Sequence, residues 1–273
     1  MSAPYEPLTG AGGAAEAGGI RLDLSGHVAL VTGSTGQLGR VIARTLAQAG
    51  ADIVLHYHGN EAKAKELHAE LAALGRSIMI AQADVTKLDS VQAMRAAAVA
   101  SGMRPVDIVV ANAVVQYGWT SVLEQPVEDY VSQFESCVLQ SVHLAKAFVP
   151  AMKQGGWGRM IGINTECAMQ NFPTQSAYVA GKRGMDGVYR VLAKEVGADG
   201  ITVNQVAPGW TISERDRENG TERSEGYEST VPLRRRGTDQ EIAHAVAFLA
   251  SDLASFITGA YLPVNGGNVM PAI

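Results

Sequence analysis

The residues best suited to chemistry are Tyr178 and Lys182, which stand four positions apart. The pattern around them predicts a helix, and positions i and i+4 share one helix face. An ammonium group beside a phenol favours the phenolate and lowers the tyrosine pKa from its ordinary value of about 10. Such a tyrosine could donate or accept a proton near neutral pH. The same spacing also fits an exposed pair without function, so the surrounding elements decide between the two interpretations.

A second informative stretch contains three glycines spaced three apart, Gly33, Gly36 and Gly39. An apolar run at 28–32 precedes them, and a helical pattern at 40–49 follows. Glycines permit a tight turn and let a ligand approach the backbone. The N–H groups and the dipole of the helix N-terminus then face a phosphate. Because both the strand and the helix are present, the stretch predicts a dinucleotide site.

Strand and helix patterns alternate along the chain. We expect strands at 28–32, 52–57, 77–82, 106–111, 158–163, 202–206 and 260–264, and helices at 37–49, 61–74, 90–100, 127–152, 175–196 and 240–250. This order predicts an α/β fold, a doubly wound parallel sheet (Rossmann fold) in a single domain. Ligands of such sheets bind beyond the carboxyl ends of the strands, where the strand order switches.

The domain is expected to span residues 21–273, after a flexible N-terminal tail of residues 1–20. From Gly10 to Gly19, nine of ten residues are glycine or alanine. Such a segment buries too little apolar surface to offset the entropy of ordering it. Docking of this tail on a neighbouring subunit is the alternative. No internal repeat or linker marks a second domain.

Composition excludes several classes of function. The 273 residues are 47% hydrophobic and 18% charged, with a net charge of −5, which is ordinary for a globular domain. Without a basic block, no nucleic-acid partner is expected. We expect no membrane span, which needs about 20 apolar residues, and no signal peptide. The two cysteines do not form a disulfide framework, so we expect a cytoplasmic location.

Further motifs follow the glycine turn in a fixed order. They are Asp84-Val85-Thr86, Asn112-Ala113, Gly158-Arg159, Tyr178-x-x-x-Lys182, Val203-Asn204, Pro208-Gly209, Phe248-Leu249-Ala250-Ser251, Ile257-Thr258-Gly259 and Gly266-Gly267. Together they make residues 26–268 resemble the classical short-chain dehydrogenase/reductase family. Within it the chain is most similar to the 3-oxoacyl-carrier-protein-reductase-like branch, which acts on many carbonyl and alcohol substrates.

The resemblance implies catalytic roles for three residues. Tyr178 would protonate the carbonyl oxygen as hydride arrives from the nicotinamide. Lys182 would bind the nicotinamide ribose and depress the pKa of Tyr178. Thr165 stands thirteen residues before the tyrosine, where the family has a serine, and keeps a hydroxyl that can orient a carbonyl.

The resemblance also implies a nicotinamide dinucleotide site. Asp84 would accept from the adenine amino group, Val85 would pack on the ring, and Asn112 would lie beside the adenosine ribose. The turn at 208–213 would hold the carboxamide end. The expected cofactor-binding residues are Gly33, Thr35, Gly36, Gln37, Leu38, Gly39, Tyr57, His58, Asp84, Val85, Asn112, Ala113, Tyr178, Lys182, Pro208, Gly209, Thr211 and Ser213.

The choice of cofactor depends on the end of the second strand. Family members that prefer NAD carry an acid there to hold the ribose 2′-hydroxyl. Here the corresponding residue is Tyr57, followed by His58. Without the acid a 2′-phosphate is not repelled, so we favour NADP over NAD. No metal site is expected, because His56 and His58 lack a third ligand nearby.

Four positions depart from the family pattern. Gln37 stands at the second glycine of the turn, where Gly36 gives a spacing that resembles the extended branch. Val114 replaces the glycine of Asn-Asn-Ala-Gly, and Thr165 replaces the serine. Cys137 aligns with an asparagine that helps hold a water between the lysine and solvent. These changes keep two alternatives open, a nucleotide-binding protein without redox activity and a dehydratase- or epimerase-type enzyme.

Three charged features remain. Glu166 is either a member of a structural ion pair or an acid that faces the substrate. The polar stretch 213–230 stands where the family keeps a mobile substrate lid, although a solvated loop also fits it. The run Arg234-Arg235-Arg236 is expected to be solvated and ion-paired.

The leading hypothesis is an oxidoreductase that transfers hydride between NAD(P) and a small-molecule carbonyl or alcohol substrate, with Tyr178 as the general acid/base. The family usually assembles as tetramers through its long helices and its C-terminal strand. Apolar residues at 257–264 and 269–273 fit buried packing, so a homo-oligomer is expected.

Overall fold

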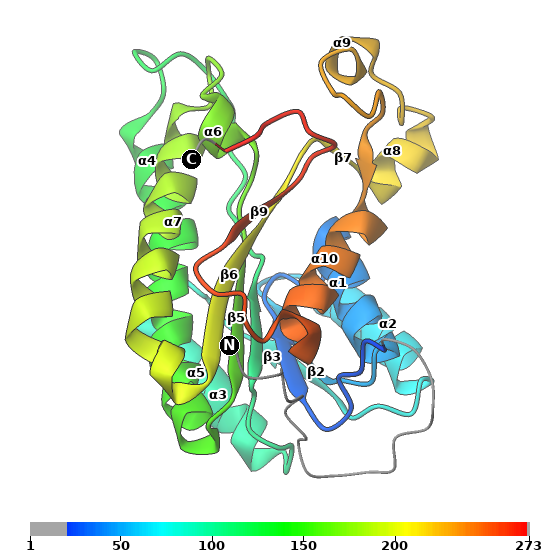
Figure 1. Ribbon diagram of the computed structural model, residues 1–273, viewed down its shortest axis with the longest axis vertical. Coiled ribbons are helices and arrows are strands. Elements are labelled where there is room, and N and C mark those ends of the chain that lie inside the picture. Colours follow the sequence, from blue (N-terminus) through cyan, green and yellow to red (C-terminus); the bar gives the residue numbers. More distant parts are fainter. Residues whose placement is uncertain (1–20, 272–273) are drawn as a thin grey trace, which may run out of the picture.

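The computed structural model describes residues 21–271. Residues 1–20 and 272–273 lie outside this range, so the expectation of a flexible tail at 1–20 concerns residues that the structure does not describe. Seven parallel strands form one sheet in the order β3-β2-β1-β4-β5-β6-β9, as the alternating pattern predicts (Figure 1). They are β1 (Val28–Val31), β2 (Asp52–Tyr57), β3 (Ile78–Gln82), β4 (Ile108–Ala111), β5 (Gly158–Ile163), β6 (Ile201–Pro208) and β9 (Tyr261–Val264).

Helices cover both faces of the sheet (Figure 1). One face carries α1 (Gln37–Gln48), α2 (Glu61–Ala72) and α10 (Asp239–Ala250), and the other carries α3 (Leu88–Ala100), α5 (Gln140–Gly155) and α7 (Ser176–Val196). Because both faces are covered, every residue of β1 and β4 is buried. Three short helical segments lie between these elements, namely α6 (Cys167–Gln170), η2 (Gly197–Asp199) and η3 (Asp252–Ala254). Within residues 21–271, no helix has the length and apolar character to cross a bilayer.

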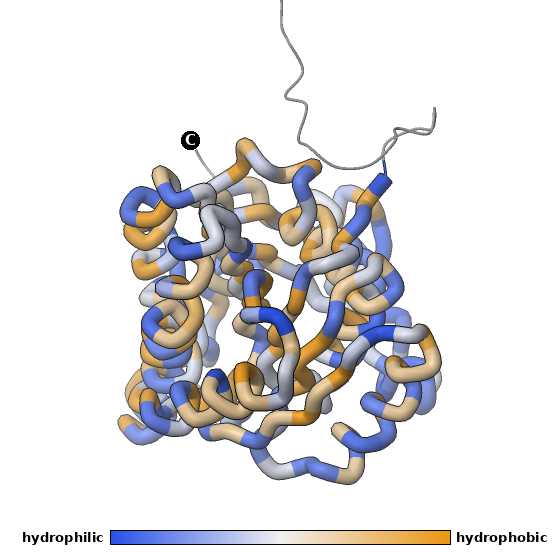
Figure 2. Tube along the Cα trace, turned by 90° about the horizontal axis from the view of Figure 1, so that it is seen from below, coloured by the Kyte–Doolittle hydropathy of each residue, from blue (hydrophilic) through white to orange (hydrophobic). Residues whose placement is uncertain are grey.

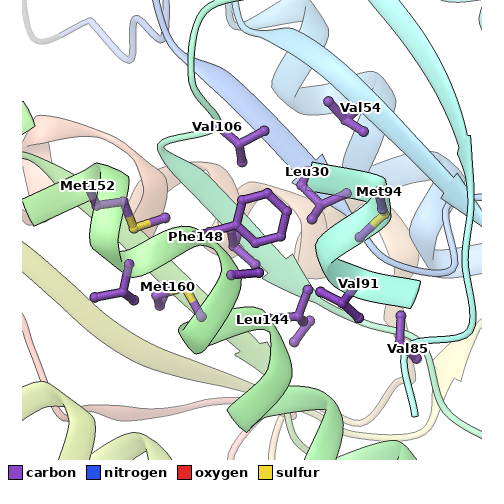
Figure 3. Packing of buried hydrophobic residues seen from close by; sticks show 14 of the residues in the cluster. Leu30, Val54, Val85, Val91, Met94, Val106, Leu144, Phe148, Met152 and Met160 are labelled. Atoms are coloured by element: carbon purple, nitrogen blue, oxygen red, sulfur yellow. The ribbon is translucent and has the colours of Figure 1, made fainter. Parts of the chain in front are cut away.

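The core consists of two apolar clusters, one on each face of the sheet. Figure 3 shows part of the cluster between the sheet and α3 and α5, with Phe148 near Leu30 and Leu144 near Val91. Apolar residues concentrate on the strands and on the inward helix faces, while polar residues lie outside (Figure 2). This packing fixes the helices against the strands and so positions the residues that follow each strand.

The strand order switches at β1, which lies between β2 and β4. All strands are parallel, so their carboxyl ends meet at one edge of the sheet. Gly33 follows β1, Asn112 follows β4 and Thr165 comes two residues after β5. These motifs, far apart in the sequence, therefore meet beyond one edge.

The helix expected at 127–152 is a composite. It comprises α4 (Val127–Gln133), a π-helical segment η1 (Phe134–Leu139) and α5, which runs on past Pro150 to Gly155. It stops at Gly156, whose left-handed φ of 65° suits glycine at a helix C-terminus. Single π-helical turns are frequent at functional sites. Here the segment contains Ser136 and Cys137, and both side chains are buried.

The polar stretch 213–230 contains two short helices, α8 (Glu214–Asn219) and α9 (Glu225–Glu228), which lie beyond the sheet edge (Figure 1). They stand between β7 (Thr211–Ile212) and β8 (Gly237–Thr238), which pair with each other. Ser213 begins α8 as an N-cap and forms a capping box with Asp216. We refer to residues 213–230 as the lid segment.

The arginine run is only partly as expected. Arg235 forms an ion pair at the surface, but Arg236 is 1% exposed, so the prediction that it is solvated is wrong. Its guanidinium donates to the carbonyls of Thr211 and Thr221 and to the carboxylate of Asp216. A rigid fork of donors can satisfy several carbonyls at once. Arg236 therefore ties the lid segment to β7.

Candidate active site

The turn after β1 has the form that a phosphate site needs. Gly33 has a φ of +62°, and a Cβ on Gly39 would lie 2.2 Å from the carbonyl oxygen of Gly33. Both positions therefore require glycine. Gly36 begins α1 without a side-chain cap, and the first turn of α1 carries no acidic side chain. The N–H groups of this turn are thus available to an anion.

His56 of β2 holds this turn in place. Its Nδ1 accepts the N–H of Gly33 at 2.9 Å, so Nε2 carries the proton and donates to the carbonyl of Ala83 at 3.0 Å. The ring is 1% exposed, and burial lowers its pKa to about 4. His56 is therefore neutral at physiological pH and acts as a hydrogen-bonded brace. Within residues 21–271 no cluster of His, Cys, Asp or Glu could hold a metal ion.

A cavity of about 820 Å³ extends from the glycine turn to Tyr178. Sixteen of the residues expected in the site line it, namely Gly33, Thr35, Gly36, Gln37, Leu38, Gly39, His58, Asp84, Val85, Asn112, Ala113, Thr165, Tyr178, Lys182, Pro208 and Gly209. The cavity thus gathers the motifs of six separate strand ends.

Three expected cofactor residues do not line this cavity. Tyr57 is buried, because alternate side chains of β2 point to opposite faces and those of His56 and His58 take the cavity side. Thr211 lines a neighbouring cavity instead. Ser213 caps α8, with its hydroxyl 2.6 Å from a carboxylate oxygen of Asp216.

Several residues that line the cavity had no site role predicted from the sequence. They are His56, Gly59, Asn60, Thr86, Val114, Val115, Gln116, Ser136, Ile163 and Asn164. Most of them lie within a few residues of a strand's carboxyl end, and this position in the sequence could have predicted that they line the cavity. Ser136 has no such signal, because its place depends on the π-helical segment. Its hydroxyl is buried and has no hydrogen-bond partner among the described residues.

Asp84 and Asn112 both line the cavity. One carboxylate oxygen of Asp84 accepts from the backbone and the hydroxyl of Thr86, at 2.9 and 2.7 Å, so the other oxygen remains for a ligand. The side-chain amide of Asn112 donates to the carbonyl of Thr32 at 2.9 Å, and its backbone N–H donates to the Thr32 hydroxyl at 2.9 Å. Asn112 therefore braces the glycine turn.

Tyr178, Lys182 and Thr165 meet at the other end of the cavity. The Lys182 Nζ lies 5.7 Å from the centre of the Tyr178 ring and donates to the carbonyl of Ile163 at 2.6 Å. Thr165 lines the cavity and donates its N–H to the Asn164 side chain, while its hydroxyl accepts from the N–H of Cys167 at 3.2 Å. The three expected catalytic groups are thus brought together.

The pKa of Tyr178 differs from the sequence-based expectation. Burial raises it well above the ordinary value, and the Thr165 hydroxyl opposes this rise. The ammonium of Lys182 is directed to a backbone carbonyl instead of the phenol oxygen, so it does not dominate the tyrosine pKa. Tyr178 therefore holds its proton at neutral pH, but the raised pKa makes the phenol a weaker acid than an ordinary tyrosine.

Cys137 belongs to the core. It is 1% exposed and packs in the apolar cluster that includes Leu144 and Tyr189. Its thiol is therefore a small apolar group and lies outside the cavity. This side chain therefore does not take the polar role of the family's asparagine.

A second cavity, of about 560 Å³, adjoins the first. Thr165, Tyr178 and Gly209 line both, so the second cavity opens onto the same phenol and hydroxyl. Its other walls come from the segment after β4, from α6 and from the lid segment. The second cavity therefore gives access to Tyr178 from the side of the lid segment.

Glu166 lines this second cavity and is 3% exposed. Its carboxylate accepts from the Tyr227 hydroxyl at 2.8 Å and from the Asn268 amide at 3.1 Å. It forms no ion pair with any residue the structure describes, so the ion-pair alternative is wrong. Burial raises its pKa, against the hydrogen bonds that lower it.

Comparison with known proteins agrees with this geometry. A family profile described as enoyl-(acyl carrier protein) reductase matches residues 34–268. The 3-oxoacyl-[acyl-carrier-protein] reductase FabG of Haemophilus influenzae is 36% identical over 244 residues, which cover 89% of this chain and 98% of the relative.

Solved structures are similar as well. A gluconate 5-dehydrogenase from Burkholderia cenocepacia, in complex with NADP and tartrate, has a TM-score of 0.83 at 28% identity, covering 91% of this chain and 97% of that one. A blue fluorescent protein from a metagenomic library, in complex with NADPH, has a TM-score of 0.82 at 34% identity, covering 91% and 100%. The profile match at residues 34–268 spans the positions of Gly36, Gly39, Tyr178 and Lys182. The chain belongs to the short-chain dehydrogenase/reductase family.

Proposed function

We propose that this oxidoreductase reduces a carbonyl group of a small-molecule substrate with NADPH, with Tyr178 as the proton donor. The observation that carries the proposal is the junction of the two cavities at Tyr178 and Thr165. One cavity has the shape and donors for a dinucleotide, and the other has room for a substrate. The phenol and the hydroxyl stand where the two would meet.

The residues present fit a dinucleotide. The uncapped N-terminus of α1 would hold the pyrophosphate, because its N–H groups have no side-chain partner. Asp84 would accept from the adenine amino group through its free oxygen. Lys182 would hold the nicotinamide ribose. When bound, the cofactor supplies a hydride to the carbonyl carbon.

The chain's own residues supply the proton and the orientation. The Thr165 hydroxyl donates a hydrogen bond to the substrate oxygen and holds it near the phenol. Tyr178 gives its proton to that oxygen as negative charge develops there. Burial raises the pKa of the phenol, and the hydrogen bond from Thr165 opposes this rise and so favours release of the proton.

NADPH is preferred over NADH because the end of β2 carries no acid. His58, Gly59 and Asn60 line the cavity there, and none of them repels a phosphate. Both the gluconate 5-dehydrogenase and the metagenomic protein are described with the phosphorylated cofactor. We therefore propose NADP as the cofactor of this chain.

The proposal is tested by titrating the protein with NADPH and NADH while cofactor fluorescence is followed, and then by offering ketones and aldehydes to the loaded enzyme. We expect binding in the micromolar range, tighter for NADPH, and consumption of NADPH with at least one carbonyl class. Absence of binding below about millimolar for both cofactors would contradict the proposal. Binding without turnover of any carbonyl or alcohol would favour a nucleotide-binding protein without redox activity.

We also propose a homotetramer in a reducing cytoplasm. Val127, Val131 and Phe134 form an exposed apolar row along α4 and η1, at 70%, 52% and 51% exposure. Large apolar side chains in one row favour burial by another subunit. Cys137 and Cys167 are both free thiols, as a reducing compartment maintains them.

A further inference from the structure

The second cavity has aromatic walls. Tyr117, Trp119, Phe172, Trp210 and Tyr227 line it together with Tyr178. Large parts of three of these rings face open space, since Trp119, Phe172 and Trp210 are 49%, 54% and 53% exposed. The faces of such rings attract both apolar groups and cations.

Glu166 is the one charged residue among those that line this cavity in the described structure. Within residues 21–271, two other acidic side chains are buried to a similar degree, and each has an arginine partner. Glu228 pairs with Arg223 at 2.8 Å and Asp239 pairs with Arg217 at 2.6 Å. Glu166 has only neutral donors. A buried carboxylate without a counter-charge is costly, and a cationic ligand in the cavity would offset that cost.

Arg236 does not supply this charge. Its guanidinium lies 4.5 Å from the centre of the Trp210 ring, outside the cavity lining. It is already engaged by Asp216 and by backbone carbonyls. The carboxylate of Glu166 therefore remains the one uncompensated charge at this place in the described structure.

We infer that the second cavity takes a carbonyl substrate with an aromatic or apolar body and a positively charged amino group, and that Glu166 is the counter-ion of that group. This inference rests on the proposed reductase function and names the substrate class. The ammonium lies between the carboxylate and the aromatic rings, and the carbonyl reaches Tyr178 and Thr165. Substrates that carry a carboxylate are disfavoured, because no cationic side chain lines the cavity in the described structure.

The test uses benzylamine, benzyl alcohol and phenylacetate as probes of the protein loaded with NADPH. Quenching of tryptophan fluorescence reports their binding, because Trp119 and Trp210 line the cavity. We expect benzylamine to bind about tenfold more tightly than benzyl alcohol, and phenylacetate to bind most weakly. Equal affinities for the amine and the alcohol, or no binding of the amine, would overturn the inference.

Three variants locate the effect. Glu166→Gln keeps an acceptor for Tyr227 but removes the charge, so it should abolish the preference for benzylamine. Glu225→Gln removes a charge from the exposed surface of α9 and should leave the preference unchanged. Tyr227→Phe removes the hydrogen bond to Glu166 and leaves its charge, so the preference should persist. If Tyr227→Phe abolishes the preference as fully as Glu166→Gln, the lid contact is responsible and the inference fails.

Failure of the inference and failure of the proposed function remain distinguishable. Acetophenone, para-(aminomethyl)acetophenone and para-acetylphenylacetate are offered to the same loaded enzyme. Reduction of acetophenone tests the function irrespective of charge. A higher kcat/KM for the amino ketone, lost in Glu166→Gln, tests the inference, and reduction of acetophenone without that difference would reject the inference alone.

Discussion

His56 joins the glycine turn to the end of β3 while it remains neutral. Its two ring nitrogens have opposite roles, one accepting from Gly33 and the other donating to Ala83. Protonation would place a second donor against the N–H of Gly33 and would bury a charge. Single residues of this kind, outside the catalytic set, determine whether the phosphate site keeps its form.

This brace predicts a pH-dependent stability. The pKa of His56 is about 4 in the folded protein and about 6.5 when unfolded, so the unfolded state binds more protons between these values. The free energy of unfolding should therefore fall as the pH drops from 6.5 to 4, by up to about 3 kcal/mol. Urea unfolding at several pH values measures it. His56→Gln, which keeps both hydrogen bonds, should lose this part of the slope.

The matched control is His244→Gln, because His244 is exposed on α10 and does not act on His56. It should retain the wild-type slope. An unchanged slope in His56→Gln would show that other groups cause the loss of stability in acid.

At the scale of elements, the β1–α1 turn and the strand ends form the proposed cofactor site. A Cβ at Gly39 would lie 2.2 Å from the Gly33 carbonyl oxygen and 2.9 Å from the Asn112 amide, so the turn must move to admit one. Gly39→Ala should lower the free energy of unfolding by about 1–3 kcal/mol and weaken NADPH binding at least about tenfold. Thermal unfolding and fluorescence titration measure the two effects.

Gly187→Ala is the control for this prediction. Gly187 lies on α7 outside the cavity, and a Cβ there meets nothing within 4 Å. Its stability should not fall, and its NADPH affinity should stay near that of the wild type. Wild-type affinity in Gly39→Ala would instead show that the turn is not the phosphate site.

The elements could be predicted well because the parallel strands are buried on both faces and read as apolar runs. The order of the motifs also placed Gly33, Asp84, Asn112 and Tyr178 at one edge, since parallel strands end together. The side-chain details could not be predicted. Tyr57 points away from the cavity, Arg236 is buried, and the Tyr178 pKa follows burial. Each of these depends on tertiary packing, which a linear pattern does not contain.

The π-helical segment is a further case. Periodicity predicted one regular helix, because a single wider turn scarcely alters the apolar repeat. That turn nevertheless brings Ser136 to the cavity and leaves Cys137 in the core. The cysteine at position 137, where the family has an asparagine, therefore contributes to the packing of the core.

At the scale of the whole molecule, the exposed row on α4 and η1 predicts assembly. Val131→Glu should shift the proposed tetramer to smaller species, because a charge in an apolar interface is costly to bury. Light scattering coupled to size-exclusion chromatography measures the mass. Val99→Glu, on the exposed side of α3 at 57% exposure, is the control and should leave the mass unchanged. A monomeric wild type would contradict the proposal, as would a tetramer that tolerates Val131→Glu.

The fold as a whole brings two cavities together at Tyr178. The most direct test is Tyr178→Phe, with NADPH affinity and turnover of a reducible ketone measured on the same sample. We predict that turnover falls by about a hundredfold to ten-thousandfold while NADPH binding and the unfolding midpoint stay near those of the wild type. The control is Tyr189→Phe, which lies on α7 outside both cavities and whose hydroxyl has no hydrogen-bond partner among the described residues, and it should behave as the wild type. Retained turnover in Tyr178→Phe would contradict the account, because the proton would then come from another group.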